Sequence, residues 1–417
     1  MQAEILATGE EIRTGAVLDS NSAHIARRLE QEGLTVVRHL CVGDDLALLA
    51  ATLKEIGVRA EVAVVTGGLG PTVDDLSAAA AARAAGVATV FNPEALAAVE
   101  RFLRALGIPL SPSQRKQALL PEGADWLANP VGSAPGFEMV IGRCRFFFLP
   151  GVPHEMRRML AEQVLPRLHR LLPAARERHL THTVSVFGET EAAVGDRLAP
   201  LPEKFPGVRL GLRADFPQIQ VKLYLSGAAG ADLDQHLAAA AGWVRERLGP
   251  AVFSEGGEAM ETVVGRLLLA RKATLAVAES CTGGLICHWL TNVPGSSGFF
   301  LFGGVTYANS AKSGVLGVDG QTLARVGAVH EETAREMAVG VRRVAGATYG
   351  LATSGIAGPD GGSPEKPVGT LCIGLAGPQA ANAFRFRFTS GRRLANKTRF
   401  AMKALDLLRC ALLEAAV

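Results

Sequence analysis

The chain has 417 residues, of which 48% are hydrophobic and 20% are charged. This length predicts about three domains, and this composition excludes a disordered chain. The formal net charge of +3 is too small for a dedicated nucleic-acid binder, whose affinity depends on many phosphate contacts.

The first predicted domain covers residues 1–172, where strand and helix patterns alternate. Apolar runs predict strands at 2–9, 35–43, 61–68 and 144–151. Helical spacing predicts helices at 19–33, 46–57, 71–86 and 152–172. Such alternation is typical of an α/β domain with three layers, in which helices cover both faces of a mostly parallel sheet.

Pro173 and the charged stretch 174–179 predict a boundary between this domain and a smaller one at 173–257. The smaller domain has a β-α-β-β-α pattern, with adjacent strands at 208–215 and 219–227, which is typical of a small α+β sandwich. A polar linker then leads to a third domain, 258–417, which is again α/β. Its predicted strands lie at 274–280, 299–307, 349–355, 368–377 and 382–390.

In the first domain, the densest glycine motif is VVTGGLGPTVDD, residues 64–75, which follows a predicted strand. Its glycines, Gly67, Gly68 and Gly70, would let backbone N–H groups approach a phosphate. Asp74 and Asp75 would suit a divalent cation that bridges phosphates. A tight turn with an Asp helix cap explains the same residues equally well.

Other polar residues also follow predicted strands of the first domain. They are Glu10, Glu11, Asp19, Asn21, Asp44, Asp45 and the segment 149–156, LPGVPHEM. Ligands of open α/β sheets sit outside the carboxyl ends of the strands. Although each segment alone is explained by turns and caps, their shared placement favours a binding site. His154 alone is a poor catalytic candidate.

In the third domain, TLAVAESCTGGL at 274–285 brings Ser280 to the end of a strand and the start of a helix. A nucleophile there is favoured by the helix dipole, and backbone N–H groups near Thr282 to Gly284 would hold an oxyanion. Ser280 is also explained as a helix cap, and Cys281 is a second, less favoured nucleophile. Lys312 would serve as a base if burial lowers its pKa, although a solvated lysine is the simpler interpretation.

Two further segments of the third domain suggest an anion site. The glycine-rich loop 353–370 would wrap a phosphate or ribose through Ser354, Gly355 and Gly358, or form a surface loop. Four cations lie at the start of the last helix: Arg392, Arg393, Lys397 and Arg399. Cations at a helix start do not favour that helix's own dipole, which suggests a ligand role.

The amino-terminal motifs resemble the CinA (competence/damage-inducible) family, whose first half resembles the molybdopterin-binding fold. They include 5 segments of the first domain, among them VVTGGLGPTVDDL and LPGVPHEM. The resemblance implies hydrolysis of ADP-ribose to AMP and ribose 5-phosphate with a divalent metal of unspecified identity. The expected metal ligands are Asp44, Asp74 and Asp75. The expected substrate contacts are Asn21, Gly67, Gly68 and Gly70.

The motifs AESCTGG, YANSAK, TSGIAGPDGG and KPVGT resemble the carboxy-terminal CinA domain, which is similar to nicotinamide mononucleotide (NMN) deamidases. The resemblance implies that NMN and water give nicotinate mononucleotide and ammonia, without a cofactor. Ser280 would be the nucleophile and Lys312 its base. Tyr307 is expected as a third catalytic residue that positions the substrate or Lys312. The expected substrate contacts are Thr282, Gly283, Gly284, Ser354, Gly355 and Arg393, the last of these meeting the phosphate.

The expected partners are therefore the small nucleotides NMN and ADP-ribose, and a homodimer is plausible. We see no signal peptide or membrane span, and six scattered cysteines suggest reduced thiols, so we expect a cytoplasmic protein without a membrane partner. Two alternatives remain open. One is a molybdopterin-binding protein, and the other is a non-catalytic adaptor in DNA uptake or recombination.

Overall fold

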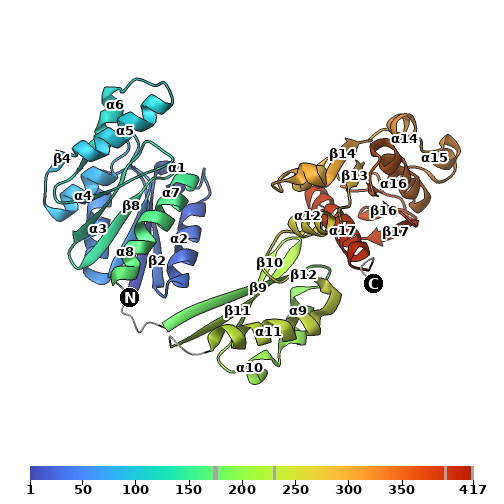
Figure 1. Cartoon of the computed structure of the whole chain (residues 1–417), viewed down its shortest axis with the longest axis horizontal. Helices are drawn as coiled ribbons and strands as arrows, with labels where there is room; N and C mark the ends of the chain where they lie inside the picture. Colours follow the sequence, from blue (N-terminus) through green and yellow to red (C-terminus); the bar gives the residue numbers. More distant parts are fainter. Residues whose placement is uncertain (172–176, 229–231, 389–391, 415–417) are drawn as a thin grey trace. The chain divides into compact units, whose positions relative to one another are not determined.

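A computed structural model of the chain describes residues 1–171, 177–228, 232–388 and 392–414 (Figure 1). The boundary predicted at Pro173 lies outside these residues. Contacts between residues divide the chain into two compact units. The first contains Met1–Thr181 and Leu225–Leu233, and the second contains His182–Tyr224 and Asp234–Val417.

The first unit is built on a six-stranded sheet with the order β2-β1-β3-β8-β7-β6. The strands are β1 (Gln2–Thr8), β2 (Thr35–Val42), β3 (Val62–Thr66), β6 (Asp125–Leu127), β7 (Gly136–Ile141) and β8 (Cys144–Leu149). β2, β1, β3 and β8 are parallel, whereas β7 and β6 are antiparallel. The four predicted strands are the four parallel ones, so their carboxyl ends meet at one edge.

Helices cover both faces of this sheet, which confirms the predicted three layers (Figure 1). One apolar core lies under α3 (Leu46–Arg59) and α4 (Ser77–Ala85). The other core lies under α2 (Ser20–Gln31) and the long segment formed by α7 (Pro153–Met159), η2 (Leu160–Val164) and α8 (Leu165–Leu171).

Some elements of the first unit differ from the sequence prediction. The helix predicted at 71–86 begins only at Ser77, because residues 70–75 form a closed loop. The segment between α4 and β7 contains elements that the apolar pattern did not predict. They are β4 (Thr89–Phe91), α5 (Pro93–Ala105), α6 (Pro112–Arg115), η1 (Lys116–Ala118) and β5 (Leu119–Pro121). Between β1 and α2 lies the short α1 (Glu10–Arg13).

The middle segment forms a four-stranded sheet with the order β10-β11-β9-β12, accompanied by helices, as the α+β pattern predicts. Its strands are β9 (Glu177–Val186), β10 (Arg209–Asp215), β11 (Gln218–Ala228) and β12 (Val252–Ser254). Its helices are α9 (Glu191–Leu198), α10 (Leu201–Lys204), α11 (Leu233–Leu248) and η3 (Gly249–Ala251).

The carboxy-terminal segment has a five-stranded sheet with the order β14-β13-β15-β16-β17. Its strands are β13 (Leu275–Glu279), β14 (Phe300–Val305), β15 (Tyr349–Gly355), β16 (Thr370–Ala376) and β17 (Ala381–Arg387). β14, β13 and β15 are parallel, so Ser280 and the residues after β14 and β15 share one edge. β16 and β17 are antiparallel.

Helices also cover both faces of this second sheet. They are α12 (Met260–Ala270), α13 (Leu285–Thr291), η4 (Ser296–Gly298), α14 (Asn309–Leu316), α15 (Gly320–Val326), α16 (Glu331–Ala345) and α17 (Arg393–Glu414). α12, α13 and α17 enclose one core, which also contains Phe187 and Phe253 of the middle segment. α14 and α16 enclose the other. Among the described residues, no helix is both long and apolar enough to span a bilayer.

Candidate active sites

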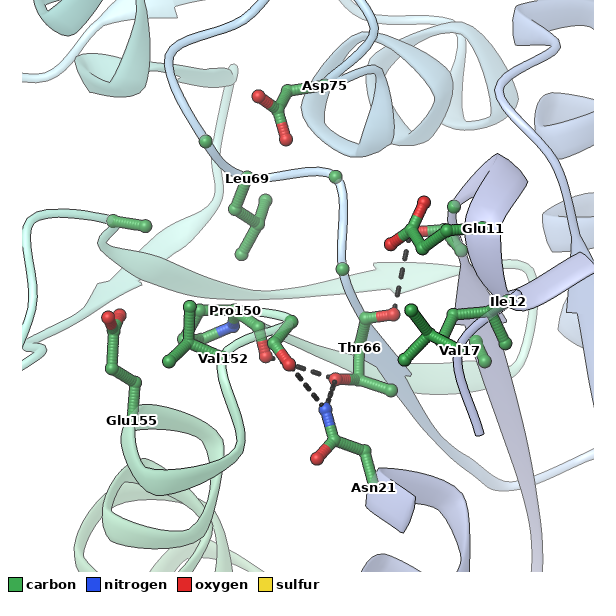
Figure 2. Close-up of a pocket in the computed structure, with 18 of the residues that line it drawn as sticks. Glu11, Ile12, Val17, Asn21, Thr66, Leu69, Asp75, Pro150, Val152 and Glu155 are labelled. Atoms are coloured by element: carbon green, nitrogen blue, oxygen red, sulfur yellow. Dashed lines mark hydrogen bonds between the residues drawn. The ribbon is translucent and has the colours of Figure 1, made fainter. Parts of the chain in front are cut away.

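A cavity of about 560 Å³ lies at the carboxyl ends of β1, β3 and β8 in the first unit (Figure 2). Its wall includes all seven residues that the sequence predicts for the first site: Asn21, Asp44, Gly67, Gly68, Gly70, Asp74 and Asp75. Parallel strands that end together therefore bring these separate segments to one cavity, as expected for the edge of an open α/β sheet.

The glycine loop of this cavity presses against the end of β1. Gly67 has a φ of 109°, and a Cβ there would lie 2.4 Å from the Thr8 carbonyl oxygen. Gly68 also has a positive φ, and the Ser77 hydroxyl donates to the Gly67 carbonyl oxygen at 2.8 Å. Only glycine fits at Gly67 without moving backbone, because both its conformation and its space exclude a side chain.

Asp75 holds the same loop closed. Its carboxylate accepts hydrogen bonds from the Thr72 N–H at 2.8 Å and from the Thr72 hydroxyl. A Cβ at Gly70 would lie 2.6 Å from Asp75 Oδ2, so the carboxylate packs onto the loop backbone. Lys116 Nζ donates to the Asp75 carbonyl oxygen at 3.0 Å. The geometry gives Asp75 a structural role in the loop, and the metal-ligand role stays a prediction.

Asp44 and Asp74 lie in a group of acidic side chains. Asp44 Oδ2 accepts the Glu10 N–H at 3.1 Å. Burial raises the pKa of Asp44, and the negative charges of Asp74, Glu11 and Glu10 raise it further, against the hydrogen bond from Glu10. The Thr72 hydrogen bond lowers the pKa of Asp74. Acidic side chains that repel one another favour a bound cation.

The carboxylates of Asp44, Asp74 and Asp75 nevertheless do not form a complete metal site. Among the described residues, no three His, Cys, Asp or Glu side chains lie close enough together to hold a metal ion. Magnesium is commonly held by one or two carboxylates together with substrate phosphates and water. A cation therefore fits this cavity only if the substrate supplies part of its ligands.

Asn21 joins two strand ends at the floor of the cavity (Figure 2). Its Nδ2 donates to Thr66 Oγ1 at 3.1 Å and to the Gly151 carbonyl oxygen at 2.7 Å. Thr66 Oγ1 in turn donates to the Pro150 carbonyl oxygen at 3.0 Å. The amide nitrogen is thus engaged within the protein, and Asn21 fixes the shape of the cavity floor.

Glu155 is a cavity residue that the sequence reasoning did not single out. It lies on α7, across the cavity from Glu11 (Figure 2). Asn129 Nδ2 donates to its Oε2 at 2.7 Å, and a Cβ at Gly132 would lie 2.1 Å from that oxygen. The only sequence signal for Glu155 is its place in the segment LPGVPHEM, directly after His154. His154 is exposed and lies outside the cavity wall.

The second cavity, of about 190 Å³, lies at the edge of the carboxy-terminal sheet. Its wall contains Ser280, Cys281, Tyr307, Lys312, Ala328, Val329, Ser354, Gly355, Ala357 and Arg393. Lys312 Nζ lies 3.2 Å from Ser280 Oγ, although 32 positions separate the two residues. The structure therefore brings the predicted nucleophile and its predicted base together.

Lys312 is almost fully buried, with 1% of its surface exposed, and this desolvation lowers its pKa. Its Nζ also lies 2.8 Å from the Thr306 carbonyl oxygen and 2.9 Å from that of Tyr307. A neutral amine has two N–H donors and one lone pair. Two carbonyl acceptors and one hydroxyl match that set, so the site suits a neutral lysine that accepts a proton from Ser280.

The turn after Ser280 differs from the predicted oxyanion site. The Gly283 N–H donates to the Ser280 carbonyl oxygen at 3.2 Å, and the Gly284 N–H donates to Glu279 Oε2 at 3.0 Å. Thr282 is fully buried, and its hydroxyl pairs with that of Thr353 at 2.7 Å. The N–H groups of Gly283 and Gly284 and the hydroxyl of Thr282 are thus engaged inside the protein.

Two other N–H groups of this turn are not engaged by an oxygen in the same way. Within the described residues, the N–H groups of Cys281 and Thr282 have no oxygen acceptor. Both directly follow the predicted nucleophile. The Cys281 thiol itself is buried, which raises its pKa to about 12, so it is a poor nucleophile at neutral pH.

Three other predicted residues line the same cavity. Arg393 donates to the Gly358 carbonyl oxygen at 2.8 Å and to the Tyr307 hydroxyl at 3.3 Å. Tyr307 is 61% exposed, so much of its surface faces solvent. The Ser354 hydroxyl donates to the Ala328 carbonyl oxygen at 2.6 Å and retains acceptor capacity.

The predicted cation cluster at the start of α17 is divided. Arg393 lines the cavity. Lys397 lies over the turn, since a Cβ at Gly283 would be 3.2 Å from its Nζ. The Arg399 guanidinium instead packs over the ring of Phe216, 4.8 Å from its centre. Arg393 and Lys397, four residues apart on one helix face, therefore lie at the cavity wall and over the adjoining turn, respectively.

The fold and both cavities define a protein of two α/β domains, each with a polar cavity at the carboxyl edge of its sheet. Residues 4–170 match the family described as "Probable molybdopterin binding domain". Residues 257–412 match the family described as "CinA C-terminal domain". This chain belongs to the CinA family.

Relatives cover the whole chain. A CinA-like protein of Desulfosudis oleivorans is 52% identical over 99% of this chain and 100% of its own length. One of Desulforapulum autotrophicum is 50% identical over 98% of both chains. The crystal structure of the protein CinA from Thermoplasma acidophilum is 32% identical, covering 38% of this chain and 94% of that one, with a TM-score of 0.36.

Proposed function

We propose that this protein hydrolyses two nucleotides, NMN in the carboxy-terminal cavity and ADP-ribose in the amino-terminal cavity. The observation that carries the first activity is the buried Lys312 amine 3.2 Å from the Ser280 hydroxyl. The choice of NMN rests on the resemblance of the AESCTGG and YANSAK motifs to the deamidase domain.

In the proposed deamidation, neutral Lys312 takes the proton of Ser280 as Ser280 Oγ bonds to the carboxamide carbon. The Cys281 and Thr282 N–H groups hold the oxyanion. Lys312 then gives its proton to the leaving nitrogen, and ammonia departs. Water, deprotonated by Lys312, attacks the ester and releases nicotinate mononucleotide and free Ser280.

The charges around the second cavity support a phosphorylated substrate. Arg393 lines its wall, and Lys397 lies beside Gly283. Arg and Lys both bind phosphate oxygens through charge-assisted hydrogen bonds. A cavity of about 190 Å³ suits the pyridine ring, which leaves the ribose phosphate to extend toward these cations at the start of α17.

The test of the deamidase is ammonia release from NMN by wild type and by Ser280→Ala. Loss of the nucleophile should reduce kcat by roughly 10³-fold or more. Ser310→Ala, which alters an exposed serine on α14, is the matched control and should retain full activity. Undiminished turnover by Ser280→Ala would overturn the assignment.

For the amino-terminal cavity, the proposed reaction is hydrolysis of ADP-ribose to AMP and ribose 5-phosphate. Its volume of about 560 Å³ suits a dinucleotide-sized ligand, and the glycine loop offers backbone close to a diphosphate. Asp44 and Asp74 would hold a divalent cation together with that diphosphate. The cation would neutralise phosphate charge in the transition state.

The test of this activity is the formation of AMP from ADP-ribose, with Mg²⁺ or Mn²⁺ and with a chelator. Asp44→Asn and Asp74→Asn should each reduce the rate about 10-fold or more, because each removes a carboxylate that favours the cation. Asp125→Asn, at an exposed position on β6, is the control. Full activity in both site variants and in chelator would exclude the metal role.

A second candidate for the amino-terminal domain is molybdopterin binding, which the matched family description favours. Its glycine loop would meet the pterin phosphate in the same way. Pterin that remains bound through purification, together with no turnover of ADP-ribose, would support this alternative. ADP-ribose turnover by protein without pterin would exclude it.

A further inference from the structure

A fully buried carboxylate adjoins the proposed nucleophile. Glu279 is the last residue of β13, directly before Ser280, and none of its surface is exposed. It does not line the cavity around Ser280 and Lys312. A buried charge without a favourable partner is costly, so the arrangement around Glu279 needs a physical explanation.

The partners of Glu279 are backbone N–H groups at the start of α13. Oε2 accepts from the Gly284 N–H at 3.0 Å and from the Ile286 N–H at 3.2 Å. Oε1 accepts from the Cys287 N–H at 2.8 Å. Both oxygens are therefore engaged, so Glu279 is neither a free base nor a substrate contact. It also occupies the donors that a substrate phosphate would otherwise use at this helix.

These contacts fix the turn between β13 and α13 at both ends. At its start, the Ser280 N–H donates to the Thr353 carbonyl oxygen of β15 at 3.0 Å. At its end, the Glu279 side chain binds Gly284 back to the strand. Ser280, Cys281 and Thr282 lie between the two anchors. Their hydroxyl and N–H groups therefore depend on the carboxylate for their orientation.

We infer that Glu279 is a positioning residue for amide hydrolysis, which holds the Ser280 hydroxyl and the Cys281 and Thr282 N–H groups in reactive geometry. This inference rests on the proposed deamidase. It assigns Glu279 an effect on the rate of acyl transfer, since Arg393, the proposed phosphate contact, belongs to α17. Small displacements of reacting groups cost up to about 10²-fold in rate.

The sharpest variant is Glu279→Gln, which keeps the shape of the side chain. Its NH₂ group would face an N–H donor where a carboxylate oxygen now accepts one, so either the Cys287 bond or the Gly284 and Ile286 bonds are lost. We expect kcat for NMN to fall about 10- to 100-fold, with KM changed by less than about 3-fold. A merely structural role would lower the melting temperature without this separation of kcat from KM.

The matched control is Glu336→Gln. The Glu336 carboxylate also accepts a backbone N–H, that of Asp319 at 2.9 Å, and the Thr322 hydroxyl at 2.8 Å. It lies on α16, outside the cavity wall. The control should retain the wild-type kcat. If Glu279→Gln does not fold, Glu279→Asp retains the charge but shortens the reach, and it should show the same selective loss of kcat.

A substrate-independent measurement distinguishes this inference from the choice of NMN. A fluorophosphonate probe labels activated serines, and its rate of reaction with Ser280 reports nucleophile geometry directly. We expect slower labelling of folded Glu279→Gln than of wild type. Slower labelling without NMN turnover in wild type would support Glu279 and reject NMN. Wild-type kcat and labelling in folded Glu279→Gln would overturn the inference.

Discussion

Lys312 shows how burial converts an ordinary lysine into a candidate base. Desolvation destabilises its ammonium form, so its pKa lies below the ordinary 10.5. The neutral fraction rises as the pH rises through this lowered pKa. We therefore predict that kcat for NMN increases with pH and reaches its plateau below pH 10.5. Measurements of kcat at intervals of about one pH unit across pH 6–10 would define this rise.

Lys312→Arg tests the same point by substitution. A guanidinium stays protonated over this whole range, so kcat should fall about 10²- to 10⁴-fold and the alkaline rise should disappear. Lys272→Arg alters an exposed lysine of the same domain and should leave both the rate and the pH profile unchanged. An active Lys312→Arg enzyme would show that Lys312 is not the base.

Cys281 provides the comparison between the two neighbouring nucleophiles. Burial raises the pKa of its thiol to about 12, so almost no thiolate exists at neutral pH. We predict that Cys281→Ala retains kcat within about 3-fold, because the proposed oxyanion donor at this position is its backbone N–H. A loss as large as that in Ser280→Ala, measured by ammonia release, would favour the thiol instead.

At this scale, the sequence predicts residue types better than residue contacts. The AESCTGG motif identifies Ser280 as a strand-end serine, but the spacing of 32 positions does not show that Lys312 reaches it. The contact exists because β13 and β14 are parallel and end at one edge. For Thr282, the motif and the structure differ. Its place in the motif suggested a substrate contact, whereas its hydroxyl is used inside the protein by Thr353.

At the scale of elements, the parallel strands explain why the amino-terminal motifs meet. Continuous apolar runs predicted β1, β2, β3 and β8, and the segments that follow them line one cavity. The region between α4 and β7 was not predicted, because its strands are short and lie partly exposed. Asp75 could not be assigned from sequence, since its effect depends on the closed loop.

The glycine loop gives a prediction for the same domain. Gly67→Ala places a Cβ 2.4 Å from the Thr8 carbonyl oxygen and forces a positive φ on alanine. We expect a loss of stability of roughly 1–3 kcal/mol in the first unit and a lower rate of ADP-ribose hydrolysis. Thermal unfolding and AMP formation measure the two effects.

The control for this prediction is Gly86→Ala, at the end of α4. Gly86 also has a positive φ, of 74°, but no atom lies within 4 Å of the added Cβ. Gly86→Ala therefore strains the backbone but creates no steric clash. ADP-ribose hydrolysis should be retained in this variant. Equal loss of activity in both variants would indicate a general loss of fold instead of damage to the loop.

At the scale of the whole molecule, the near-neutral net charge of +3 conceals two local charge patterns. Acidic side chains surround the amino-terminal cavity, whereas cations stand near the carboxy-terminal one. The sequence also predicted a division at residue 257. The described structure groups most of the middle segment with the carboxy-terminal one, because Phe187 and Phe253 share a core with α12 and α17.

Each cavity is lined only by residues of its own unit, which predicts that the two proposed activities are independent. Ser280→Ala should abolish ammonia release from NMN and leave AMP formation from ADP-ribose unchanged. Asp44→Asn or a chelator should have the opposite effect, because the nucleophile, base and oxyanion donors of the proposed deamidation are protein groups and not a metal ion.

The measurement is a single reaction mixture that contains NMN, ADP-ribose and a divalent metal, in which all products are separated for wild type and both variants. Loss of both products in Ser280→Ala would contradict independence and indicate that one site serves both reactions. Loss of both in chelator, with the fold retained, would mean that the deamidase also requires the cation. The predicted pattern is the loss of one product pair at a time, because the proposed deamidation places no metal ion at Ser280.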